Sequence, residues 1–236
     1  MRPFFKSLSC CFRIVCCAAI MASVHTVAAQ KEAPRQIAFS TIAFESMPSD
    51  LWYEDNGQPM KLQPGGSVRG PRQTYNGPNP LTFFRLEPDG KGGQKRVPQA
   101  QVDIPNDVNE ALLCFSPMPV ANGQLPWQVY AMDDSLHSLN VGEIRFVNLT
   151  DKSIAGVLDN ETIRLAPGGY ETIKPNAKEQ NFGIKLAAYL EKQWEPFFSS
   201  RWQYRENVRL IVLFLPDAKN GKVRMQAVTQ RVASDS

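Results

Sequence analysis

The chain has 236 residues, with 26 lysines and arginines, 23 aspartates and glutamates, and a formal net charge of +3. This length accommodates one or two domains. The basic excess lies within residues 1–29, which carry three basic residues and no acidic one, so the remainder balances 23 basic residues against 23 acidic ones. A neutral remainder gives no general attraction to nucleic acid or to anionic membranes, and functions that depend on such attraction are excluded.

Residues 1–29 have the pattern of a secretory signal peptide. A basic start precedes an apolar core from Ile14 to Val24, and Val27-Ala28-Ala29 supplies small residues before a predicted cleavage at Gln30. The apolar core is far shorter than the roughly 20 residues of a membrane-spanning helix. We therefore expect a periplasmic or extracellular protein with no transmembrane segment in the mature chain. The alternative is a retained N-terminal helix or anchor.

Cleavage would leave a single cysteine. Cys114 alone lies beyond the predicted signal, so the mature chain cannot form an internal disulfide. It belongs to the apolar run Ala111-Leu112-Leu113-Cys114-Phe115, which predicts a role in core packing rather than a reactive thiol.

The rest of the chain contains an internal repeat. Leu62-Gln63-Pro64-Gly65-Gly66 returns 103 residues later as Leu165-Ala166-Pro167-Gly168-Gly169, and an Asp-Asn pair precedes each copy. Both copies end with a long apolar run, an Asn-Gly pair and another strand-like segment. A period near 100 residues predicts two tandem domains, because solenoids and propellers repeat at shorter intervals. The alternative is chance similarity between turn-rich β sequences.

The first copy, residues 37–132, follows a polar lead-in at 30–36 and consists of short strand-like segments between turn signals. The stretch 65–80 is rich in Gly and Pro and predicts a loop with one short strand. The run 111–115 lacks polar alternation, which predicts burial on both faces. Strands are expected at 37–44, 51–53, 59–62, 81–86, 97–104, 111–115 and 127–132.

A junction at residues 133–141 contains little Gly or Pro, which predicts limited hinge freedom between the copies. The second copy, 142–232, precedes a polar tail at 233–236. Residues 181–190 also contain good helix formers, so a helix is the alternative there. Strands are expected at 143–150, 170–174, 181–190, 194–204, 208–215 and 223–232, with a hairpin around Asp159-Asn160. The pattern predicts an all-β fold of two tandem immunoglobulin-like β-sandwiches.

Sequence motifs for catalysis or metal binding are weak. His137 is the one histidine of the mature chain, and we expect a solvated junction residue because a zinc site needs several His or Cys ligands. Asp133-Asp134 reads as a surface acidic pair, and residues 89–93 as a hairpin turn rather than a phosphate-binding loop. Asn148-Leu149-Thr150 and Asn160-Glu161-Thr162 match the short N-glycosylation pattern. No metal or other cofactor is expected.

The most distinctive stretch is the aromatic hairpin at residues 193–205. Along a strand, Phe198, Ser200, Trp202 and Tyr204 share one face, whereas Phe197, Ser199, Arg201 and Gln203 share the other. Two interpretations follow. Trp202 and Tyr204 belong to the sandwich core with Arg201 and Gln203 outside, or Trp194, Arg201, Trp202 and Tyr204 form a platform for a sugar ring or a protein partner. Trp52 and Tyr53 point to opposite faces, so at most one of them is a core residue.

Residues 142–215 resemble a loosely defined group of uncharacterised bacterial exported proteins. The resemblance is carried by Ile144-Arg145-Phe146-Val147-Asn148-Leu149-Thr150, by Val157-Leu158-Asp159, by residues 163–168 and by the Trp-rich hairpin, and it is weaker over the first copy. It implies a signal peptide and immunoglobulin-like β domains, with no established activity and no catalytic residues.

These observations favour a non-enzymatic binding or structural protein of the periplasm or cell exterior, which contacts an envelope or extracellular protein through its sheet faces or loops. The first alternative is a carbohydrate-binding protein that uses the aromatic hairpin at 193–205. The second is a hydrolase whose catalytic carboxylates are distant in sequence. Edge strands could also pair between two copies of the chain.

Overall fold

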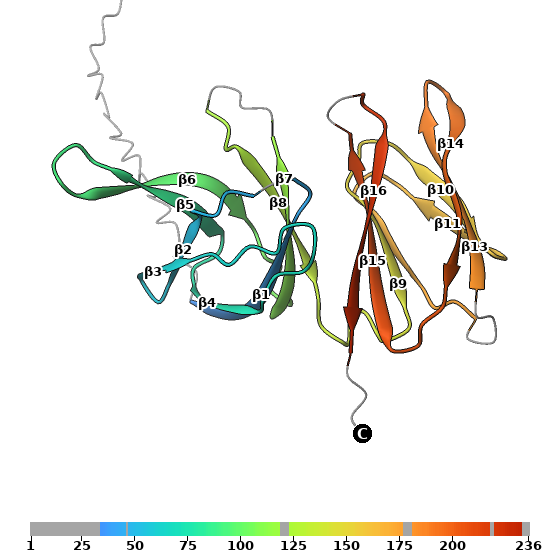
Figure 1. Ribbon diagram of the computed structural model, residues 1–236, viewed down its shortest axis with the longest axis horizontal. Helices are drawn as coiled ribbons and strands as arrows, with labels where there is room; N and C mark the ends of the chain where they lie inside the picture. Colours follow the sequence, from blue (N-terminus) through green and yellow to red (C-terminus); the bar gives the residue numbers. More distant parts are fainter. Residues whose placement is uncertain (1–33, 46, 119–122, 177–180, 218–219, 233–236) are drawn as a thin grey trace, which may run out of the picture. The chain divides into compact units, whose positions relative to one another are not determined.

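The computed structural model describes residues 34–45, 47–118, 123–176, 181–217 and 220–232 (Figure 1). Within these ranges the chain forms β-strands and no helix, which confirms the all-β prediction. Residues 181–190, for which a helix was the alternative, form strand β13 (Asn181–Leu190). No helix in the described ranges could cross a membrane. The predicted signal peptide, the tail at 233–236 and the start of the lead-in lie outside the described residues.

The first half of the described chain is a sandwich of two four-stranded sheets with the orders β4-β1-β7-β8 and β3-β2-β5-β6. Strands β4 and β5 turn alternate side chains inward, as the buried Tyr75 of β4 and the buried Leu81 and Phe83 of β5 show. The bounds are β1 Arg35–Ala43, β2 Trp52–Asp55, β3 Gln58–Lys61, β4 Gln73–Gly77, β5 Leu81–Pro88, β6 Gln94–Val102, β7 Glu110–Pro117 and β8 Trp127–Asp133.

The second half repeats this plan, with the sheet orders β12-β9-β15-β16 and β11-β10-β13-β14. Figure 1 shows each half as two facing layers of strands. The two tandem β-sandwiches confirm the predicted fold class. The bounds are β9 Ile144–Asn148, β10 Ile154–Leu158, β11 Glu161–Leu165, β12 Tyr170–Ile173, β13 Asn181–Leu190, β14 Gln193–Gln203, β15 Val208–Pro216 and β16 Val223–Arg231.

The two sandwiches share their irregular features as well as their strand order. In each, the first strand lies parallel to the seventh, β1 with β7 and β9 with β15. Each also carries a bulge in its sixth strand directly after a proline: Gln99 after Pro98, and Phe197 after Pro196, are skipped in the pairing. Bulges at equivalent positions are the structural counterpart of the internal repeat.

In the first hairpin of each sandwich, the equivalent turn residues differ by one position from those that the two Asp-Asn pairs suggest. The two-residue turns are Asn56-Gly57 and Asp159-Asn160, because Asp55 pairs with Gln58 and Leu158 with Glu161. Asn56 and Asp159 both have positive φ, of 48° and 49°. These two residues are 103 apart, like Leu62 and Leu165, so the two Asp-Asn pairs are not equivalent.

Each sandwich has its own apolar core. The core of the first includes Phe39, Tyr53, Phe83 and Phe115, whose rings meet edge to face at centroid distances of 5.0–6.4 Å. The core of the second contains Phe146 and Phe214, with Phe182 beside them. Tyr53 is buried and Trp52 is half-buried, as the opposite faces of a strand require.

A third cluster joins the two sandwiches. It combines outer-face residues of β1, β7, β9, β15 and β16, all of them buried: Ile42, Phe44, Leu112, Cys114, Val147, Ile211, Leu213, Leu215 and Val228, with Leu139 from the junction. Strands β7 and β15 are therefore buried on both faces, which confirms the interpretation of the unalternating run 111–115. Cys114 is fully buried in this shared cluster, where desolvation raises the pKa of its thiol and keeps it protonated.

The junction between the sandwiches is held by a buried charge cluster. Asp134 is 8% exposed, and its carboxylate pairs with Arg69 of the first sandwich and, at 3.3 Å, with Arg209 of the second. The interpretation of Asp133-Asp134 as a surface pair is thus wrong for Asp134. Arg209 also donates to the carbonyl oxygens of Ser135 and Leu139 at 3.2 and 3.3 Å.

Two further buried polar residues of β9 fix the chain around the junction and the following turn. Arg145 donates to the carbonyl oxygens of Asp133 and Ser138. The Asn148 side-chain amide donates to the carbonyls of Lys152 and Ala166 at 2.7 and 3.0 Å. Because Asn148 is fully buried, it anchors a turn, and its glycosylation-like pattern is a structural feature.

We predict that Asp134→Asn destabilises the protein by about 3–5 kcal/mol, because it leaves the buried guanidinium of Arg209 and the half-buried guanidinium of Arg69 without their counter-charge. Glu87→Gln is the matched control, since Glu87 belongs to an ion pair with Lys95 in which both side chains are about half exposed, and it should cost less than about 1 kcal/mol. Urea denaturation measures both. Similar losses for the two variants would contradict the role assigned to Asp134.

Candidate binding grooves

An open groove of about 1210 Å³ runs along β8, and we call it the β8 groove. The first sandwich contributes β8 itself and the segment that follows β6. The second contributes the loop after β9, with Leu149, Thr150 and Asp151, and the start of β12 at Tyr170. Its walls thus come from segments that are distant in sequence.

Strand β8 presents unpaired backbone to this groove. It is the last strand of its sheet, bonded to β7 alone. The Asp134 amide bonds to the Glu110 carbonyl and the Met118 amide to the Pro126 carbonyl. Because antiparallel pairing alternates, the amides of even-numbered residues such as Tyr130 face β7, and those of Val129 and Ala131 face outward. Within the described ranges, no backbone partner meets these outward amides.

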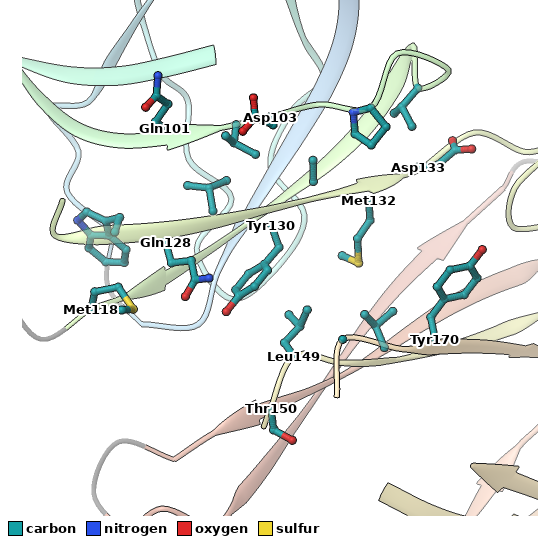
Figure 2. Close-up of a pocket in the computed structure, with 18 of the residues that line it drawn as sticks. Gln101, Asp103, Met118, Gln128, Tyr130, Met132, Asp133, Leu149, Thr150 and Tyr170 are labelled. Carbon is teal, nitrogen blue, oxygen red and sulfur yellow. The ribbon is translucent and has the colours of Figure 1, made fainter. Parts of the chain in front are cut away.

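The groove has an apolar and aromatic lining. Figure 2 shows Tyr130 and Met132 projecting from β8 toward Leu149 and Tyr170 on the other side. Tyr130 is half-buried, and desolvation raises the pKa of its hydroxyl. Tyr170 is 68% exposed and lies over Arg145, whose guanidinium carbon is 5.3 Å from the ring centroid. The lining therefore combines half-buried and exposed aromatic side chains.

Acidic side chains surround this lining. Asp103, Asp107, Asp133 and Asp151 all border the groove, and Arg145 is the one basic residue among its described lining residues. Arg145 is already bonded to Thr172 and the junction carbonyls. No group of three or more His, Cys, Asp or Glu residues in the described part of the chain is arranged to hold a metal ion. Asp151 forms an ion pair with Lys152 at 3.1 Å, whereas Asp103, Asp107 and Asp133 form none with a described residue, so the exposed charge of the groove is negative.

A second groove of about 430 Å³ lies in the second sandwich between β14 and β16, and we call it the β14–β16 groove. It contains three of the four ligand residues predicted from the sequence, Arg201, Trp202 and Tyr204. Its floor consists of core residues such as Phe182 and Ile144, which are 3% and 5% exposed. Along the side between β14 and β16, the groove therefore extends from the protein surface to core residues of this sandwich.

Trp202 of the aromatic hairpin contacts the core and also lines the β14–β16 groove. Trp202 packs edge to face on Phe182 at 6.2 Å and on Phe198 at 5.9 Å, yet it stays half exposed and lines the groove. Arg201 and Gln203 are exposed, as expected for the outer face. The assignment of Phe197 to that outer face is wrong, because the bulge turns it inward onto Phe214 at 5.9 Å.

A glycine lets Tyr204 lie close to the backbone beside this groove. Gly142 has a φ of 82°, and a Cβ atom there would meet the Tyr204 hydroxyl oxygen at 2.6 Å. Any other residue at position 142 would therefore be strained and would displace the tyrosine.

Trp194 lies apart from the other three predicted residues. It is 50% exposed and pairs across the hairpin with Tyr189, itself 44% exposed, at a ring-centroid distance of 5.3 Å. It borders a separate hollow with Arg164 and Ile154. The structure thus divides the predicted platform into a groove and a separate aromatic pair. His137 is exposed at the junction, as predicted.

Sequence reasoning missed the β8 groove. Its residues come from β8, the segment after β6, the loop after β9 and β12, so no short motif marks it. A comparison with models of known protein families found no match, and a comparison with curated proteins likewise found none.

Proposed function

We propose that this protein is an exported, non-enzymatic binding protein that docks an extended segment of a partner protein in the β8 groove. The observation that carries the proposal is the free edge of β8, whose outward amides run along the β8 groove. An extended segment that pairs with such an edge gains main-chain hydrogen bonds, while flanking pockets select its side chains.

The chemistry of the groove indicates the partner. Its aromatic and sulfur-containing lining, with Met118, Tyr130 and Met132, suits apolar side chains, because thioethers and tyrosines adapt to varied shapes. Its bordering aspartates favour basic residues through complementary charge, which raises the association rate and disfavours acidic competitors. We therefore expect a partner segment that alternates apolar with lysine or arginine residues.

The proposed location follows from the sequence. The signal-like pattern of residues 1–29 supports export, so the partner is expected to be an envelope or extracellular protein.

In-cell photocrosslinking tests the proposal. A photoreactive amino acid in place of Gln128, which is exposed on β8 and borders the groove, should give one or two discrete protein adducts at fixed stoichiometry. The same amino acid in place of Lys61, exposed on β3, is the positional control. Ala131→Pro should abolish the adducts because it removes an outward amide, and Ala131→Ser should keep them.

Adducts that survive Ala131→Pro in a protein that remains folded would refute edge pairing on β8. Adducts with wall polysaccharide alone would favour carbohydrate binding over the docking of a protein segment.

Carbohydrate binding is the second candidate, and the exposed pair of Trp194 and Tyr189 favours it. An exposed tryptophan face is a suitable surface for stacking a sugar ring. Because the other predicted residues lie in the β14–β16 groove, we assign this candidate to Trp194 and Tyr189 alone.

Iodide quenching of tryptophan fluorescence tests this candidate. Trp194→Phe should remove most of the iodide-accessible emission, because Trp52, Trp127 and Trp202 are all half-buried. A glycan that stacks on Trp194 should protect the native protein from iodide and should have no effect on the variant. Full quenching in the presence of envelope polysaccharide would count against sugar binding there.

The hydrolase alternative finds less support. The general acid of a glycosidase lies in a pocket that shields it from water, whereas Asp103, Asp107 and Asp151 at the β8 groove are exposed. Asp133 is half-buried, and its carboxylate accepts the Ser135 amide at 2.9 Å. We therefore favour a binding role for this groove.

A further inference from the structure

We infer that the β14–β16 groove is a second docking site, which takes an extended strand of a partner protein that alternates apolar with acidic residues. This inference is independent of the β8 groove, since it concerns another edge strand, another set of side chains and a partner segment of opposite charge.

The two sandwiches differ in how closely their sixth and eighth strands approach each other. In the first sandwich β6 and β8 approach each other and close that side, with Val102 of β6 and Val129 of β8 both buried. In the second sandwich β14 and β16 show no comparable approach. The pairing registers place Ser200 where the first sandwich has Val102, and Met225 where it has Val129. Ser200 is exposed and Met225 only half-buried, so the second core lacks its closing residues.

The inner face of β16 shows the consequence. Ala227 and Thr229 lie on the same strand face as Met225, which packs on the core, yet both are exposed and both line the groove. Residues on a core-facing row are normally covered by the opposite sheet. An inserted strand would cover this row together with Trp202 and Tyr204.

The backbone of β16 has a free edge beside the groove. It is the last strand of its sheet and is bonded to β15 alone. The Val232 amide bonds to the Asn207 carbonyl, so even-numbered residues of β16 pair with β15. The amides of Ala227, Thr229 and Arg231 therefore face outward, and within the described ranges they have no backbone hydrogen-bond partner. All three residues line the groove.

Charge indicates the kind of strand. Arg201, Arg205 and Arg231 border the groove, all three are exposed, and none forms an ion pair with a described residue. The one acidic lining residue, Glu143, is already bonded to the Asn140 amide at 2.8 Å. A basic rim around an apolar floor is complementary to acidic residues that alternate with apolar ones. The edge from Ala227 to Arg231 spans about 15 Å, which matches a strand of roughly five residues.

A synthetic peptide tests the inference. The probe is Glu-Val-Thr-Ile-Glu-Val-Thr-Ile-Glu, capped at both ends and fluorescently labelled, and its binding to the mature protein is measured by anisotropy. We expect saturable submillimolar binding that weakens several-fold when salt rises to about 0.5 M. Replacing the glutamates with lysines should weaken it by about tenfold or more.

Two substitutions at one position separate backbone pairing from side-chain contact. Thr229→Pro removes an outward amide that β15 does not use, and it should weaken binding by about tenfold. Thr229→Ala keeps the amide and should bind within about threefold of the native protein. Thermal unfolding of both variants shows whether the fold is retained, and Ala227→Pro repeats the test should Thr229→Pro unfold.

Three results with the peptide would overturn the inference: equal binding by folded proline and alanine variants, preference for the lysine peptide, or no saturable binding up to millimolar peptide. Concentration-dependent dimerisation of the free protein that Thr229→Pro abolishes would also overturn it, because the edge would then belong to a second copy of the chain. None of these results changes the photocrosslinking expected from Gln128 on β8, so each of the two proposals can fail without the other.

Discussion

The structure depends on two strands that are apolar on both faces. Strands β7 and β15 each send one row of side chains into their own sandwich and the other row into the shared cluster around Cys114 and Leu213. Neither outer row could stay in water without a large hydrophobic cost, so each covers the other. Apolar contact alone does not select one orientation of the two sandwiches. The buried carboxylate of Asp134 pairs with Arg69 of the first sandwich and with Arg209 of the second, and these directional contacts favour one arrangement. The edge strands β8 and β16, which neighbour β7 and β15, are thereby fixed to a supported framework.

The two sandwiches have the same framework but differ in the charge of the side chains that border their grooves. Strand order, the parallel first and seventh strands and the bulge after a proline are common to both. The last strand of each is a free edge beside a groove, but one groove is bordered by aspartates and the other by arginines. Opposite charge on equivalent edges is what we would expect if two copies of one binding mode had diverged toward different partner segments.

Local patterns predicted local structure well. The lack of alternation in 111–115 indicated burial on both faces, and adjacent placement in a strand separated Tyr53 from Trp52. The buried role of Asp134 could not be read in the same way, because its partners Arg69 and Arg209 are 65 and 75 residues away. The two Pro-Gly-Gly repeats have the same sequence but different backbone conformations. The residue with positive φ is the second glycine, Gly66, in the first repeat and the first glycine, Gly168, in the second repeat. The inward turn of Phe197 required knowledge of a bulge that depends on pairing between strands.

Native-state hydrogen exchange of the mature protein, resolved by residue, tests the central claim that β8 and β16 are free edges. We predict fast exchange at the outward amides of Val129, Ala131, Ala227 and Thr229. The neighbouring amides of Tyr130, Met132 and Val228, which bond to β7 and β15, should exchange much more slowly. Equal protection of both sets in the isolated monomer would mean that the edges are already paired, and it would contradict the account.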